Sequence, residues 1–214
     1  MTTNILFDSD CKRCPRLYKH LTAIRSDYPD YYARPVPAFG ADDPGLLIVG
    51  LAPGLHGANA SGRPFTGDYA GILLYKTLYK YGFSNRPESI DINDGLELKN
   101  CRITNAVKCL PPQNKPIGEE IKTCNDYLKS EIASIPGELV ILALGVIAHG
   151  AVLKALALKA KDHPFGHGKN YRLTENLCLL DTYHCSRYNT NTKRLTEEMF
   201  YKIFDKVHKL LNLS

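Results

Sequence analysis

Three polar side chains in this sequence are suited to breaking the bond between a flat heterocycle and a sugar. Asn105 carries both a hydrogen-bond donor and an acceptor, so it can read the edge of a heterocyclic base. His184 can donate a hydrogen bond to a base oxygen that gains negative charge as the bond breaks. Asp68 can hold a water molecule or stabilise a cationic sugar on the opposite side. With Phe65 as a stacking face, these residues form a candidate site for N-glycosidic cleavage.

Each of these residues also has an ordinary structural explanation. Phe65 could belong to the core, and Asp68 could cap a helix expected to begin at Tyr69. Asn105 could satisfy the end of a strand, and His184 could be a hydrogen-bonded loop residue. Their expected convergence at one edge of a sheet favours the functional interpretation.

Apolar runs that alternate with helical patterns would bring these residues together. Four runs are expected to form strands: 46–49, 101–107, 139–144 and 177–183. Helices are expected to begin at Pro15 and to cover 69–79, 117–135, 146–158 and 195–211. This alternation predicts an α/β fold, a three-layer α/β/α sandwich with a central, mainly parallel four-stranded sheet. The polar loops would then lie beyond the carboxyl ends of the strands, where such sheets bind ligands.

Length and composition indicate an ordinary globular chain. We expect a single domain over residues 1–214, because 44% hydrophobic and 23% charged residues suffice for one core. The formal net charge of +5 permits a polyanionic partner without requiring one. No apolar run is long enough to span a bilayer, and the first residues do not resemble a signal peptide. We therefore expect a cytoplasmic monomer with no membrane partner.

Four of the seven cysteines have a spacing that suits metal ligation. Cys11 and Cys14 form a C-x2-C pair, whereas Cys109 and Cys124 have fourteen residues between them. Four thiolates can hold either a tetrahedral zinc ion or an iron–sulfur cluster. The wide second gap favours a [4Fe-4S] cluster that clamps the fold, with structural zinc as the alternative. The other three cysteines fit buried thiols.

The candidate residues occur in the order typical of a known family. Residues 50–68 (GLAPGLHGANASGRPFTGD) resemble the first motif of the uracil-DNA glycosylase superfamily, in its iron–sulfur branches. Residues 103–109 (ITNAVKC), the four cysteines and residues 184–189 (HCSRYN) continue the resemblance over nearly the whole chain. Leu51 stands where the type 4 branch has an acidic residue, so the sequence is most similar to family 5, the type B enzymes of broad specificity.

The resemblance implies a monofunctional DNA glycosylase that acts on DNA containing uracil and other deaminated bases such as hypoxanthine and xanthine. It would leave an abasic site and initiate base excision repair, with Asp68, His184 and Asn105 as catalytic residues. The substrate would be bound by Gly50, Leu51, Ala52, Pro53, Gly54, His56, Phe65 and Asn105. DNA would be contacted by Asn59, Arg63, Ser186, Arg187, Tyr188, Asn189, Lys193 and Arg194.

Two positions depart from the family pattern. Ala60 and Ser61 stand where an Arg-Thr pair is usual, which puts one phosphate contact in doubt. Cys185 follows the motif histidine where a small apolar residue is usual, and an exposed thiol there would be sensitive to oxidation. The alternative function is a non-catalytic, metal-cluster-stabilised nucleic-acid-binding module, which would share the basicity, the cysteines and the aromatic loop.

Overall fold

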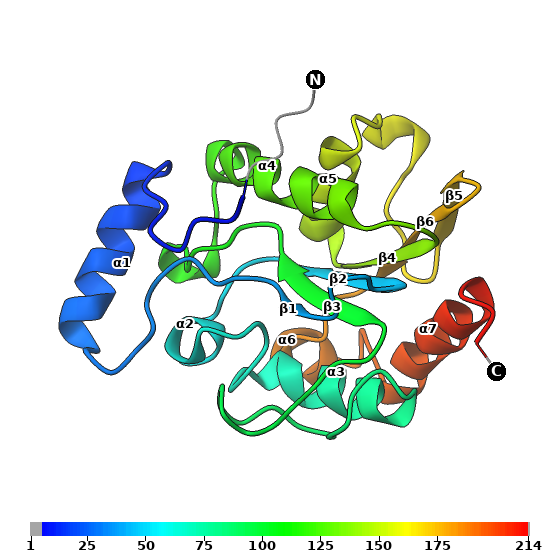
Figure 1. Cartoon of the computed structure of the whole chain (residues 1–214), viewed down its shortest axis with the longest axis horizontal. Helices are drawn as coiled ribbons and strands as arrows, with labels where there is room; N and C mark the ends of the chain where they lie inside the picture. The colour runs from blue at the N-terminus through cyan, green and yellow to red at the C-terminus, as the bar shows by residue number, and fades with distance from the viewer. Residues whose placement is uncertain (1–5, 214) are drawn as a thin grey trace.

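A six-stranded sheet separates the helices into two layers in the computed structural model, which describes residues 6–213 (Figure 1). Its strands are β1 (Phe39–Gly40), β2 (Leu46–Gly50), β3 (Cys101–Asn105), β4 (Leu139–Leu144), β5 (Asn170–Thr174) and β6 (Leu177–Thr182). Their order across the sheet is β1-β3-β2-β4-β6-β5. The central strands β3, β2, β4 and β6 are parallel, so their carboxyl ends share one edge.

The predicted three-layer α/β fold is confirmed, but the prediction of four strands is wrong at both edges of the sheet. β1 and β5 each pair with a single neighbour, in antiparallel orientation. β1 has only two residues, and β5 alternates exposed with half-buried positions. Neither strand therefore contains the continuous apolar run that marks a strand buried on both faces.

Seven α-helices surround the sheet in the described part of the chain. They are α1 (Pro15–Asp27), α2 (Ala58–Ser61), α3 (Tyr69–Lys80), α4 (Gly118–Ser134), α5 (Val146–Ala155), α6 (Arg187–Asn191) and α7 (Glu197–Leu210). Two short 3-10 helices cover Pro112–Asn114 and Ala160–Asp162. The five long helices confirm the sequence prediction, whereas α2 and α6 lie within loops in which no helix was predicted. No helix among residues 6–213 has both the length and the apolarity needed to cross a membrane.

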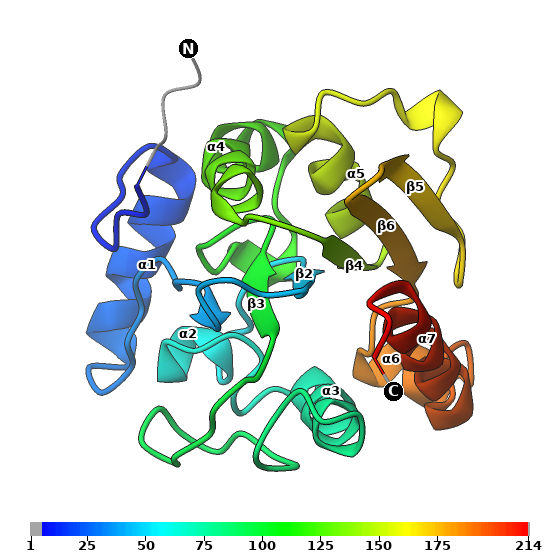
Figure 2. The same cartoon turned by 45° about the vertical axis from the view of Figure 1, so that its right-hand side comes forward.

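Alternating side chains of each central strand pack against opposite helix layers. Leu46 and Ile48 of β2 belong to the core shared with α3 and α7, whereas Leu47 and Val49 pack with α4 and α5. The helices α4 and α5 lie on one side of the sheet, and α3, α6 and α7 lie on the other (Figures 1 and 2). Both faces are covered, so ligands reach the sheet from its carboxyl edge.

The helix α1 lies apart from the sheet and builds a third, smaller core (Figure 2). Its buried residues Leu17, Leu21 and Ile24 form an apolar stripe along the helix that was predicted to begin at Pro15. They pack in the same cluster as Cys109 and Cys124, with Cys11 and Cys14 at its margin. We call α1 together with these four cysteines the cysteine lobe.

Candidate active site

Phe65 and Asn105 meet above Gly50, at the carboxyl ends of β2 and β3. Gly50 is the register partner of Asn105 in the sheet. A Cβ atom on Gly50 would lie 2.4 Å from Asn105 Oδ1 and 2.7 Å from Phe65 Cζ. Such a contact cannot be accommodated, so the absence of a side chain at this position allows the ring and the amide to converge. The positive φ of 59° at Phe65 turns the loop at this point.

His184 joins this pair from the loop that follows β6. The Phe65 and His184 rings have centroids 6.1 Å apart and planes inclined by 30°. Asn189 of α6 donates its amide N–H to the His184 carbonyl oxygen at 2.8 Å, which fixes the backbone at the histidine. Three of the predicted site residues, separated by up to 119 positions, are thus assembled at one sheet edge.

Two polar atoms in this cluster are buried without a hydrogen-bond partner. They are Asn105 Oδ1 and His184 Nδ1, and the described residues contain only one further such side-chain atom, Asn59 Oδ1. Leaving a buried polar group unpaired costs about 1–3 kcal/mol. Desolvation of the ring lowers the pKa of His184 to about 4, so the imidazole is neutral at neutral pH. Two unpaired polar groups, an amide oxygen and a neutral imidazole nitrogen, therefore lie beside an aromatic face.

Asp68 lies beside this cluster, and its carboxylate occupies a cradle made by two glycines. Cβ atoms on Gly54 and Gly57 would lie 2.4 Å and 2.0 Å from Asp68 Oδ1. The carboxylate accepts a hydrogen bond from the Ala58 N–H at 3.1 Å, which caps α2. The expected side-chain cap of α3 is not formed, although Asp68 has the N-cap position of that helix. Desolvation raises the pKa of Asp68, and the Ala58 N–H partly opposes that shift.

The glycine cradle predicts a large kinetic effect for a small substitution. In Gly57→Ala the new methyl group would displace the Asp68 carboxylate. A displacement of about 1 Å is expected to lower kcat/KM about 100-fold. Steady-state kinetics on a uracil-containing duplex measure this change. The matched control is Gly118→Ala, because a Cβ at Gly118 meets nothing within 4 Å. Equal kinetics for the two variants would contradict the role of the cradle.

Two predicted DNA contacts, Arg63 and Asn59, are buried, and the structure corrects both. The Arg63 guanidinium forms an ion pair with Asp94 at 2.6 Å and donates to Thr66 Oγ1 at 3.0 Å. It also lies over the Phe39 ring, 4.9 Å from the centroid. Asn59 is fully buried and packs in the turn of α2. Both side chains lie inside the loop: Arg63 is held by Asp94 and Phe39, far along the chain, and the Asn59 amide donates to the Leu55 carbonyl oxygen at 3.4 Å.

The remaining predicted DNA contacts divide into exposed and supporting residues. Tyr188 is 71% exposed on α6. Arg187, Lys193 and Arg194 are also exposed, and Arg187 and Arg194 lie over the rings of Tyr69 and Tyr183. In contrast, Ser186 and Asn189 are half-buried, with Ser186 capping α6. Arg187 lines a cavity with Phe65 and Asp68, and Arg194 lines another with His184. Ser186 and Asn189 instead shape the loop.

His56 and Ala52, predicted to bind substrate, line neither the cavity at Phe65 nor the cavity at His184. The exposed His56 accepts or donates a hydrogen bond through Nδ1 to the Tyr31 hydroxyl at 2.8 Å. Ala52 packs against the core of the cysteine lobe. Leu51 stays near the site, because it lines a cavity of about 460 Å³ together with His184. Pro53, which follows Ala52 in the loop, is buried.

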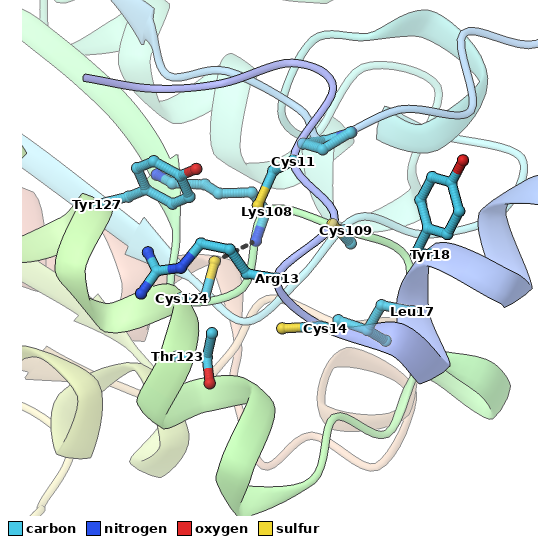
Figure 3. Close-up of a pocket in the computed structure, with 11 residues that line it drawn as sticks. Cys11, Arg13, Cys14, Leu17, Tyr18, Lys108, Cys109, Thr123, Cys124 and Tyr127 are labelled. Atoms are coloured by element: carbon cyan, nitrogen blue, oxygen red, sulfur yellow. Dashed lines mark hydrogen bonds between the residues drawn. The ribbon is translucent and has the colours of Figure 1, made fainter. Parts of the chain in front are cut away.

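The four predicted cysteine ligands line one cavity (Figure 3). The sulfur atoms of Cys11, Cys14 and Cys124 project into a shared space between α1 and α4 (Figure 3). Burial and then the neighbouring Cys124 and Cys11 thiols raise the pKa of Cys14 to about 11. A bound metal supplies the positive charge that such a set needs to become thiolate. The donor set therefore fits a metal centre.

The spacing of these donors bears on which centre they fit. Among residues 6–213, no three Cys, His, Asp or Glu side chains converge closely enough to hold a single metal ion. The backbone N–H of Lys108 donates to Cys124 Sγ at 3.3 Å, a contact that the sequence did not predict. Outside this set, Cys101, Cys178 and Cys185 are buried, as expected, and desolvation raises the pKa of the Cys185 thiol to about 12, so this thiol is not exposed to oxidation.

The fold and this arrangement define a class of protein, and comparison with known proteins agrees. The family model described as the uracil DNA glycosylase superfamily matches residues 37–208. The chain therefore belongs to this superfamily.

Its relatives specify the branch. The Type-5 uracil-DNA glycosylase of Thermus thermophilus is 43% identical over 210 residues, which cover 95% of this chain and 94% of that protein. The Type-5 uracil-DNA glycosylase of Pyrobaculum aerophilum is 39% identical over 198 residues, with coverages of 91% and 86%. A Type-4 uracil-DNA glycosylase of the same organism is 32% identical over 181 residues, with coverages of 82% and 77%. The predicted resemblance to family 5, with family 4 second, is confirmed.

Proposed function

We propose that this chain hydrolyses the N-glycosidic bond of uracil in DNA and leaves an abasic site. The observation that carries this proposal is the pair of unsatisfied buried atoms, Asn105 Oδ1 and His184 Nδ1, beside the Phe65 ring. Uracil offers a ring N–H to an acceptor such as Asn105 and carbonyl oxygens to a donor such as His184. The names of the relatives support the same activity.

The residues divide the reaction between the two sides of the bond. The nucleotide must leave the helix first, because the glycosidic bond cannot be reached within the base stack. Phe65 then stacks on the base, and the neutral His184 donates to the carbonyl oxygen that becomes negative as the base departs. Asp68 stabilises the cationic sugar and orients the water that adds to C1′, accepting a proton from it. The base leaves as an anion and is protonated by solvent.

The same groups support a wider range of bases. Hypoxanthine and xanthine, like uracil, present an N–H next to a carbonyl group. The Asn105 amide has both a donor and an acceptor, so it can pair with that edge in each base. We therefore extend the proposal to deaminated purines, as the first step of base excision repair.

We further propose that the cysteine lobe holds a [4Fe-4S] cluster. A tetrahedral zinc with Zn–S bonds of about 2.3 Å needs its sulfur atoms about 3.8 Å apart. In a cubane cluster each sulfur binds a separate iron, so the ligand sulfur atoms stand farther apart than they do around one zinc ion. When bound, the cluster supplies cross-links between the segment before α1, the loop after β3 and α4. Its contribution here is structural.

We also propose that the whole chain acts as one domain, as a monomer, in the compartment that contains the DNA. The single domain is supported by the packing of α4 against both the cysteine lobe and the sheet. Tyr127 and Cys124 of α4 belong to the core of the cysteine lobe, whereas Leu128 of the same helix packs on the sheet. A helix that contributes to both cores ties them together.

Release of free base tests the proposed activity. Duplexes that contain uracil, hypoxanthine, xanthine or thymine opposite each normal base are incubated with the protein, and strand breaks are read after alkali. Uracil release is expected, without strand nicking in the absence of alkali or heat. Binding to these duplexes without release of any base would instead establish the alternative, a non-catalytic nucleic-acid-binding module.

The pKa values of the two catalytic groups predict the pH dependence. Asp68 acts as a carboxylate, so kcat/KM rises with pH as this group ionises. Because burial raises its pKa, that rise is expected at higher pH than the ordinary value of about 3.9. His184 stays neutral above its pKa of about 4, so kcat/KM is level through about pH 6.5, where a free histidine titrates. A pH–rate profile with an alkaline limb there, lost in His184→Asn, would contradict the assignment.

A further inference from the structure

A groove of about 650 Å³ opens beside the candidate active site, and the proposed reaction does not use most of it. Phe65 and Asp68 line one end. From there the groove follows α3, past Tyr69 and Ile72, to the segment around Ile90, and Arg187 of α6 closes its side. Its volume lies in the range of small-ligand pockets and is sufficient for one nucleotide.

The walls of this groove combine apolar surface with the cation of Arg187 and the carboxylate of Glu88. Tyr69, Ile72 and Ile90 are 40%, 64% and 65% exposed, although large apolar side chains are usually buried. The Arg187 guanidinium lies 4.8 Å from the centroid of the Tyr69 ring. None of the ion pairs within residues 6–213 includes Arg187, whereas Lys76, also in the groove, is held by Glu197 at 2.9 Å.

We propose that this groove binds the nucleotide next to the flipped one on the same DNA strand. Its base would lie against Tyr69 and Ile72, and its phosphate would lie at Arg187. The inference rests on the proposed function, since it requires DNA as the substrate. It identifies residues of α3 as DNA contacts, which neither the sequence nor the comparisons indicated.

Continuity with the active site favours a nucleotide over other occupants. Asp68 acts at the target sugar, so the strand that carries this sugar must continue into the space that opens beside Asp68. Extrusion of the target base also exposes the face of its neighbour, and aromatic rings or Arg planes can restore the lost stacking. Arg187 can bind the phosphate of such a nucleotide, and the adjacent Tyr69 ring can stack on its base.

A binding cycle between protein and DNA tests the contact. The probe is an oligonucleotide that contains one 2′-fluoro-2′-deoxyuridine, which resists hydrolysis. The nucleotide on its 5′ side or on its 3′ side is either intact or replaced by an abasic tetrahydrofuran. For the unaltered protein, loss of the base on one side is expected to raise Kd about tenfold. In Tyr69→Leu and in Ile72→Ser the same loss is expected to change Kd less than twofold.

Two further variants make the cycle specific. Ile92→Ser is the matched control, because Ile92 is 58% exposed but does not line the groove, and it should keep the tenfold effect. Arg187→Gln should lower the slope of log Kd against log salt concentration by about 0.9, the change expected for the loss of one phosphate contact.

The cycle and the activity fail in different ways. If removal of the neighbouring base raises Kd by the same factor in all variants, or does not raise Kd in the unaltered protein, the groove does not bind that nucleotide. A groove that binds a protein partner instead would give this result. The cycle measures binding of an uncleaved analogue. Failure to release uracil would therefore overturn the proposed reaction while leaving this readout intact.

Discussion

Replacement of Asp68 by asparagine is expected to lower kcat by about 10²–10⁴-fold, the range measured for general acid–base groups. The amide oxygen can still accept the hydrogen bond from the Ala58 N–H and fits the same space beside Gly54 and Gly57. The carboxylate charge is lost, which in the proposed reaction stabilises the sugar cation and takes the proton from water. KM is expected to change little, because base recognition by Phe65, Asn105 and His184 is retained.

Single-turnover kinetics on a uracil-containing duplex measure this effect, and thermal unfolding verifies the fold. The matched control is Asp162→Asn, which removes a carboxylate from an exposed position on a 3-10 helix and should leave kcat unchanged. If Asp68→Asn retains kcat within tenfold, the carboxylate does not activate water, and another group must be sought in the Gly50–Asp68 loop.

The sheet and its functional edge could be predicted because they follow from apolar runs and topology. β4 shows this most simply, since all six of its residues are apolar and buried. Once four such runs are taken as parallel strands, their following loops must share one edge. This reasoning brought Phe65, Asn105 and His184 together without any knowledge of their contacts.

The fate of Arg63 could not be predicted, because it depends on a partner far along the chain. Its neighbours Gly62 and Pro64 are typical of an exposed turn. The structure buries the guanidinium against Asp94, thirty-one positions away, and over Phe39. A local pattern cannot show that a surface-type residue meets an opposite charge inside a loop.

The position of Asp68 illustrates a different limit. Sequence position correctly placed it at the start of α3, but its side chain caps α2 instead. A four-residue helix makes little more than one turn, too short for an apolar period to reveal it. Gly54 and Gly57 could have given a signal, because closely spaced glycines in a loop often mark close approach of another group.

Removal of two proposed cluster ligands, the half-buried Cys11 and Cys14, in Cys11→Ser/Cys14→Ser is expected to abolish binding of the proposed cluster and lower Tm by about 10 °C or more. Neither side chain fills the deep core, so serine at these positions costs little in packing. A large loss of stability would therefore measure the lost cross-link between α1 and the rest of the chain. Below the melting temperature, kcat is expected to stay within tenfold, because Asp68 and His184 lie on loops outside the lobe.

Iron and sulfide analysis, visible absorption and thermal unfolding provide the measurements. The unaltered protein should be brown, with iron and sulfide in the ratio of a [4Fe-4S] cluster, and the double variant should be colourless. Cys178→Ala is the matched control, because this buried thiol lies in β6, away from the lobe, and should retain the iron. A colourless unaltered protein that contains zinc would instead establish the tetrahedral alternative.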